Sequence, residues 1–253
     1  MTPPMLLLGS AGWIPTGERE TTCALLRDGE RAVLLDAGSG LRRLITDPSL
    51  LDGVRELTIL LSHFHHDHTD GLAYVPALPD GVRVQVRGPG LPLYGVPTAE
   101  LVGRFVAAPY FPVPVGRMFD AIDDLGDETF ELAGMRVRWR GQERHSHPTA
   151  AYRFDDAFAF CTDTAYDPAT ASFARGARVL LHEAVYAAER VTKPGDSHSS
   201  SGEAARVAVE AGVERLVLTH RTVGNGTDEE LLAHATRVFP ATVVAHDGML
   251  VQP

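Results

Sequence analysis

The sequence is poor in cysteine, in long apolar runs and in clustered basic residues. Its 253 residues include two cysteines, Cys23 and Cys161, which are too few for a disulfide framework and favour a reducing, cytoplasmic location. No apolar run approaches the ~20 residues that a membrane-spanning helix needs. The first residues, Met1 to Pro4, lack the basic and apolar regions of a signal peptide. We therefore expect no association with a membrane.

The charge balance argues against a polyanionic partner. There are 33 acidic and 23 basic residues, which gives a net charge of −10 with histidine neutral. No stripe of Lys and Arg is available to neutralise several phosphates, so extended nucleic acid is not an expected partner. A small-molecule substrate is expected instead. Histidine, in contrast, is abundant: the chain has 11, and several of them are clustered.

The apolar pattern predicts a layered α/β protein with mixed sheets. The run Leu57–Leu61 is continuously apolar, as is typical of a strand buried on both faces, and Gly202–Ala211 is alanine-rich and helical. Other expected elements are strands at Met5–Leu8, Thr22–Leu26, Ala32–Leu35, Gly81–Val86, Val179–Leu181 and Leu216–Leu218, hairpins at Phe130–Trp139 and Tyr152–Cys161, helices at Leu41–Ile45, Thr69–Val75 and Asp228–Val238, and a closing pair of Thr242–Val244 with Leu250–Val251. Because strands run in blocks and no composition break occurs, one domain over residues 1–253 is expected.

The segment 88–119 differs from the rest because it is rich in proline and aromatic residues. It suits a wall of the substrate pocket, a lid or a subunit contact, since long ordered loops are often functional. It equally suits a packed surface loop with one short helix near Thr98–Val106. Composition does not decide between these alternatives.

The residues after the strand Leu57–Leu61 have the spacing of a metal site. They read His63-Phe64-His65-His66-Asp67-His68. In an extended backbone alternate side chains share a face, so His63 and His65 can chelate one ion. Asp67 and His68 follow where the chain turns, and they can face a second ion. Imidazole together with carboxylate suits Zn²⁺, and also Mn²⁺ or Fe²⁺.

The HFHHDH motif, with the N-terminal sequence LLLGSAGWIPTGERETTCALLRDGERAVLLDAGSG, resembles the metallo-β-lactamase fold superfamily. More narrowly, it resembles the ribonuclease Z and small phosphodiesterase branch. The resemblance extends from Leu6 to Gly248. It implies a four-layer αββα sandwich of two mixed β-sheets flanked by helices, with two divalent metal ions at the edge of the sheets.

The resemblance also implies the remaining metal ligands. The family places a histidine before a Tyr-Arg strand, and its register favours His145, although His147 could share the same face. A bridging aspartate follows a strand at Asp163, and a histidine follows a late strand at His220. The implied set is His63, His65, His145 and Asp163 for one ion, and Asp67, His68, Asp163 and His220 for the other.

A further histidine resembles the proton donor of this branch. His198 lies in a Ser-His-Ser segment, and the resemblance implies that it protonates the leaving oxygen or stabilises charge on phosphorus. Glu183 could orient His198. Ser10, Trp13 and Thr16 lie on the first loop, which borders the active site in this family.

The predicted function is a metal-dependent phosphodiesterase that hydrolyses small or cyclic phosphodiesters. A hydroxide bridging the two metals would attack phosphorus, Asp67 would orient or deprotonate that water, and His198 would donate the proton. True ribonuclease Z carries a tRNA-binding arm between the positions of His145 and Asp163, where this sequence has one predicted hairpin. Alternatives are a lactone, ester, thioester or aryl sulfate hydrolase, a ribonuclease Z-type tRNA 3′ endonuclease, and a non-catalytic binding protein. The resemblance also allows a homodimer, since dimers are common in this branch, and the sequence does not decide the oligomeric state.

Overall fold

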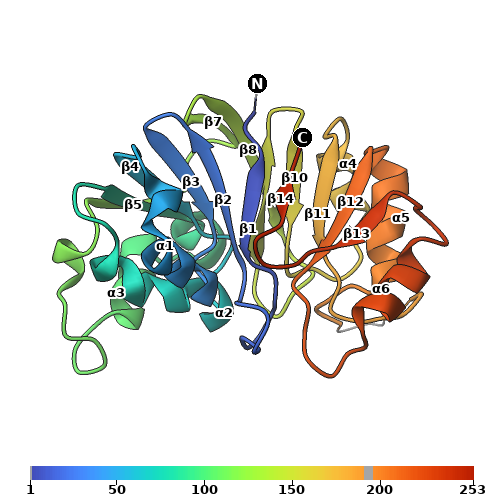
Figure 1. Cartoon of the computed structure of the whole chain (residues 1–253), viewed down its shortest axis with the longest axis horizontal. Coiled ribbons are helices and arrows are strands. Elements are labelled where there is room, and N and C mark those ends of the chain that lie inside the picture. The colour runs from blue at the N-terminus through green and yellow to red at the C-terminus, as the bar shows by residue number, and fades with distance from the viewer. Residues whose placement is uncertain (1, 191–195) are drawn as a thin grey trace.

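A computed structural model describes residues 2–190 and 196–253 and contains two seven-stranded sheets that stack face to face (Figure 1). In the first sheet the strand order is β14 (Leu250–Val251), β1 (Met5–Gly9), β2 (Cys23–Asp28), β3 (Arg31–Leu35), β4 (Glu56–Leu60), β5 (Arg83–Gly88) and β6 (Ala121–Asp124). In the second sheet it is β13 (Thr242–Val244), β12 (Arg215–Thr219), β11 (Val179–Glu183), β10 (Phe158–Cys161), β9 (Thr149–Phe154), β8 (Met135–Gln142) and β7 (Thr129–Leu132).

Helices cover the outer face of each sheet. Figure 1 shows α1 (Arg43–Thr46) and α3 (Thr98–Phe105) outside the first sheet. It shows α4 (Pro168–Ala174), α5 (Ser201–Ala211) and α6 (Asp228–Ala235) outside the second. The short helix α2 (His66–Thr69) continues into a 3₁₀ helix over Asp70–Ala77, and shorter 3₁₀ or π turns cover Ser39–Arg42, Pro48–Leu51, Gly90–Tyr94 and Val115–Arg117. The predicted αββα sandwich is thereby confirmed.

Side-chain size follows the layers of the sandwich. Between the two sheets, β9 and β10 bury the large aromatic rings of Tyr152, Phe154, Phe158 and Phe160. On their other face Ala151, Ala159 and Cys161 are small, and they belong to a cluster that includes alanines of α4 and α5. Because successive strand residues point to opposite faces, one strand supplies both layers. The small outer residues let helices lie close to this sheet, with α4 against β10 and α5 against β11 and β12.

Parallel strands bring distant segments to one edge of the sandwich. Strands β3, β4 and β5 are mutually parallel, and so are β10, β11, β12 and β13. Parallel neighbours end at the same edge of a sheet, and ligand sites gather at that carboxyl edge. Three predicted site residues follow strand ends: His63 lies three residues after β4, Asp163 two residues after β10, and His220 directly after β12.

Several expected elements differ from those observed. The predicted closing pair is wrong: β13 pairs with β12, whereas β14 pairs with β1 in the other sheet. Each short strand extends a sheet edge, and the Asp247-Gly248 turn carries the chain across. The predicted helix at Thr69–Val75 is 3₁₀ instead, and it contains Pro76, which has no N–H to continue an α-helix. Strand β6 and helix α4 were not expected, and α6 ends at Ala235, before Val238.

The segment 88–119 packs as a surface layer over the first sheet. Val102 and Val106 of the α3 region are buried against the core beneath it. The structure thus supports the interpretation as a packed loop with one helix. In the described parts of the chain, no helix has the length and apolarity needed to cross a membrane.

Candidate metal centre

The turns after the strands adopt backbone conformations that aim side chains into one site. Asp36, Asp163 and His220 have φ angles of 57°, 46° and 58°. This left-handed region is uncommon for residues other than glycine and often marks functional positions. All three side chains are buried within the same group of histidines and aspartates.

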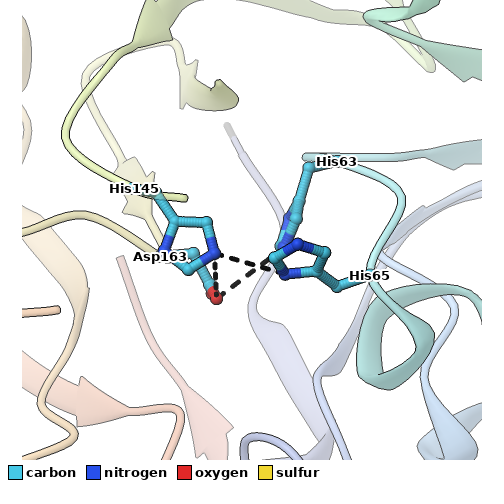
Figure 2. A group of neighbouring side chains, drawn as sticks. All are labelled: His63, His65, His145 and Asp163. Atoms are coloured by element: carbon cyan, nitrogen blue, oxygen red, sulfur yellow. Dashed lines mark hydrogen bonds and ion pairs between the residues drawn. The ribbon is translucent and has the colours of Figure 1, made fainter. Parts of the chain in front are cut away.

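The first cluster combines two histidines that follow β4 with two residues that lie about 80 to 100 positions later in the sequence. His63, His65, His145 and Asp163 each offer a ligand atom, and these atoms lie within 4.8 Å of one another (Figure 2). His145 Nε2 is 3.2 Å from His65 Nδ1 and 3.6 Å from Asp163 Oδ2. His63 Nε2 is 3.7 Å from the same carboxylate oxygen.

A second cluster lies on the other side of Asp163. It contains Asp67, His68 and His220, whose ligand atoms also lie within 4.8 Å of one another. Asp163 Oδ1 is 3.2 Å from His68 Nε2 and 3.2 Å from His220 Nε2. Asp67 Oδ2 is 3.2 Å from His220 Nε2. Asp163 therefore turns one oxygen toward each cluster, which is the arrangement of a bridging carboxylate.

The first cluster presents lone pairs suited to a cation. Burial lowers the pKa of His65 to about 4, with a further contribution from His145, and burial also holds the pKa of His63 well below its usual value. His145 Nδ1 donates to Ser197 O at 2.8 Å, which leaves Nε2 as an acceptor. His63 Nε2 is buried and has no hydrogen-bond partner in the described residues. Neutral imidazoles with a shared carboxylate fit a divalent ion, and this donor set does not select between Zn²⁺, Mn²⁺ and Fe²⁺.

The carboxylates of the second cluster draw positive charge onto its histidines. Burial lowers the pKa of His68, but Asp163, Asp67 and Asp36 outweigh it and raise the pKa well above the usual value. The pKa of His220 is likewise raised, against burial, by Asp163 and Asp67. Conversely, His220 and His68 hold the pKa of Asp163 well below its usual value despite its burial. A bound divalent ion would supply this positive charge in place of the imidazole protons.

His198 lies beside both clusters and is held by Glu183. Its Nδ1 is 2.9 Å from Glu183 Oε1, and a ligand atom of His198 lies within 4.8 Å of ligand atoms of Asp163 and His220. Glu183 is fully buried and also accepts hydrogen bonds from the backbone N–H groups of Thr164 and Ser199. Burial lowers the pKa of His198, but Glu183 outweighs it and raises the pKa to about 9.

A cavity of about 790 Å³ opens over these residues. Its floor contains residues of both clusters and His198, and its rim contains Trp13, Ile14 and Val223. Residues 88–119 do not contribute to its lining, so the structure gives no support to their role as a pocket wall.

Comparison with known proteins identifies the family. Residues 31–221 match the family profile described as "Beta-lactamase superfamily domain". The chain is 31% identical to a ribonuclease Z of Gloeothece citriformis, over 95% of this chain and 93% of the relative. The chain belongs to the ribonuclease Z-like branch of the metallo-β-lactamase superfamily. It is accordingly a hydrolase of this family.

Solved structures share the fold at lower identity. The metallo-beta-lactamase fold protein YhfI from Bacillus subtilis has a TM-score of 0.77 at 20% identity and covers 99% of this chain, which in turn covers all of YhfI. A diphosphatase from the PhnP family has a TM-score of 0.73 at 19% identity, with coverage of 99% and 97%. These similarities establish the metallo-β-lactamase fold over the whole chain.

The structure gathers all seven predicted metal ligands of this metallo-β-lactamase family member. It also separates the two competing histidines, because His145 lies in the first cluster whereas His147 is exposed and stacks beside Tyr94 at 6.4 Å between ring centres. Of the first-loop residues, Trp13 reaches the cavity. Ser10 hydrogen bonds to Asp247, and Thr16 accepts from nearby backbone N–H groups.

Sequence reasoning missed Asp36. Asp36 follows β3, which is parallel to β4, and its carboxylate accepts hydrogen bonds from Ser62 N–H at 2.6 Å, Ser62 Oγ at 2.8 Å and His68 Nδ1 at 2.8 Å. It therefore turns His68 Nε2 toward the second cluster. The available signal was the aspartate of the LLDAG sequence, which ends the strand beside the one that carries the histidines.

We predict that Asp36→Asn weakens metal binding at the second cluster by about 10- to 100-fold, as is usual for groups that orient a ligating histidine. Asparagine replaces one acceptor oxygen with an N–H₂ donor, so the contacts of Ser62 and His68 cannot all be kept. Competition with a chromogenic chelator measures the affinity. Asp28→Asn, on the exposed end of β2, is the control and should bind metal normally. Equal affinities of the two variants would contradict this role.

Proposed function

We propose that this hydrolase is a two-metal phosphodiesterase that acts on small or cyclic phosphodiesters. The observation that carries the proposal is the position of Asp163 between two complete ligand clusters, with one oxygen toward each. In this proposal His63, His65, His145 and Asp163 hold one divalent ion, and Asp67, His68, Asp163 and His220 hold the other. When bound, such ions polarise a phosphoryl oxygen and make water a better nucleophile near neutral pH.

The side chains of the chain would position the reactants and move the protons. Asp67 is fixed by a hydrogen bond from the backbone N–H of Trp13 at 2.5 Å and by His220 at 3.2 Å. Its carboxylate can orient the attacking water and accept its proton. His198 donates its Nδ1–H to Glu183, so its Nε2–H remains as the donor to the leaving oxygen.

Two comparisons favour phosphorus over carbon as the reacting centre. A curated relative is named ribonuclease Z, and a structural neighbour is named as a diphosphatase. The short connection between two ligands of the first cluster favours a small substrate, because His145 and Asp163 are joined by the hairpin β9–β10 alone. The 31% identity nevertheless makes tRNA 3′ cleavage the second candidate.

Turnover of bis(p-nitrophenyl) phosphate by the purified protein tests the proposal. We expect turnover after loading with Zn²⁺ or Mn²⁺, loss of turnover after removal of metal with a chelator, and recovery when metal is returned. Asp67→Ala should stay inactive under all these conditions. Two bound ions without hydrolysis of any diester would overturn the proposal. Panels of lactones and thioesters, and a tRNA precursor with a 3′ extension, would then identify the alternative.

A further inference from the structure

The mouth of the active-site cavity has an apolar rim. In the described part of the chain seven large hydrophobic side chains are exposed, and three of them, Trp13, Ile14 and Val223, line this cavity. Their exposed fractions are 69%, 44% and 51%. Apolar side chains that gather in a concave site, beside converging polar groups, are typical of ligand-binding surfaces.

Trp13 is exposed on a backbone that is firmly held. Its N–H donates to Asp67 Oδ2 at 2.5 Å, and the N–H of the preceding Gly12 donates to Arg221 O at 3.0 Å. A side chain at Gly12 would lie 2.3 Å from the ring of His220, so the loop crosses directly over that histidine. Trp13 itself has φ of 66°, a conformation that is costly for a large residue. The backbone that carries the exposed indole is thus fixed next to the candidate metal centre.

The cavity offers little to a substrate that carries several charges. No lysine or arginine is present among the described residues that line it. Arg221, which lies between the lining residues His220 and Thr222, is paired with Asp228, which also binds Arg19. Arg144, which precedes His145, is exposed and does not line the cavity. The carboxylates of Asp67 and Asp70 face the same cavity. Among the described lining residues, a second phosphate would find no cationic side chain besides the histidines at the reacting centre, so the part of the substrate beyond the scissile group is bound by other forces.

We propose that Trp13, with Ile14 and Val223, binds a flat aromatic group of the substrate. The substrate class is then a phosphodiester of single negative charge that carries a nucleobase or an aryl ring. This inference rests on the proposed phosphodiesterase function. Stacking of a base on an aromatic side chain tolerates many ring types, and its loss lowers affinity by about 5- to 100-fold.

Kinetics of Trp13→Ala and Trp13→Phe test the platform. The substrates are a nucleoside 2′,3′-cyclic phosphate, bis(p-nitrophenyl) phosphate and glycerol 1,2-cyclic phosphate, which lacks a ring. We expect Trp13→Ala to raise KM for the aromatic diesters about 5- to 100-fold, with little change in kcat or bound metal. Trp13→Phe should recover part of the loss. A larger rise in KM for the nucleoside cyclic phosphate would indicate recognition of a nucleobase, and a larger rise for bis(p-nitrophenyl) phosphate would indicate recognition of an aryl ring.

The matched control is Tyr110→Ala, because Tyr110 is 86% exposed and lies outside the lining of the cavity. It should behave as the unaltered protein. An unchanged KM in Trp13→Ala, or an equal loss on the ring-free substrate, would overturn the proposal. Alanine keeps the backbone N–H to Asp67, so the ligand itself is not disturbed.

A direct binding measurement separates this inference from the proposed function. If no diester is hydrolysed, the proposed function fails, while saturable quenching of tryptophan fluorescence by bis(p-nitrophenyl) phosphate still tests Trp13. The other tryptophan, Trp139, is 9% exposed, so Trp13 should give the signal. Quenching that persists in Trp13→Phe, or that dimethyl phosphate produces equally, would overturn the platform.

Discussion

Replacing Asp163 with alanine is expected to reduce phosphodiester hydrolysis by at least about 10³-fold and to release bound metal. Asp163 faces both clusters, through Oδ2 toward His145 and through Oδ1 toward His68 and His220. Its removal takes one ligand from each ion and leaves the buried imidazoles without their shared counter-charge. Turnover and the metal content per chain, measured by mass spectrometry, check this expectation.

Asp163→Asn gives a sharper result than alanine. The amide keeps one oxygen, which can face one cluster only, and turns an N–H₂ group toward the other. We expect a protein that retains one ion per chain and has lost the paired site. Asp80→Ala, an exposed carboxylate in the loop before β5, should keep both ions and full activity. Two ions and full activity in Asp163→Ala would show that the ligand assignment is wrong.

The sequence predicts best the ligands that lie together in one segment of the chain. His63, His65 and His68 follow a strand whose apolar pattern is unambiguous, and strand geometry alone places alternate residues on one face. The choice between His145 and His147 is harder, because both positions share a face. Tertiary contacts separate them: His145 is fixed by Ser197 O, whereas His147 lies beside Tyr94.

Residues that act through a neighbouring strand are the part that sequence reasoning misses. Asp36 contacts His68 because β3 and β4 are parallel neighbours. The sequence of one strand does not by itself predict which strand lies beside it. The same limit explains why the predicted pairing of Thr242–Val244 with Leu250–Val251 was wrong. Both are short, and the sheet edge available to each, rather than its own pattern, decides its partner.

Replacing His198 with alanine is expected to lower kcat by about 10²- to 10⁴-fold while both ions stay bound, as is usual for the loss of a general acid. The proton that His198 would donate matters most when the leaving oxygen is strongly basic. The loss should therefore be large for a cyclic diester with an alcohol leaving group. It should be small for bis(p-nitrophenyl) phosphate, whose phenolate leaves without help.

Glu183→Gln separates positioning from proton donation at the same site. Glu183 is fully buried and fixes His198 through Nδ1, so glutamine should keep the ring near its place but weaken its hold. We expect a smaller fall in kcat than in His198→Ala. The dependence on the leaving group should be the same, because both variants affect donation of the His198 proton to the leaving oxygen. Equal losses on both substrates would instead mean that His198 stabilises charge on phosphorus. Loss of metal in His198→Ala would make it a ligand, since its ring already lies within 4.8 Å of ligand atoms of Asp163 and His220.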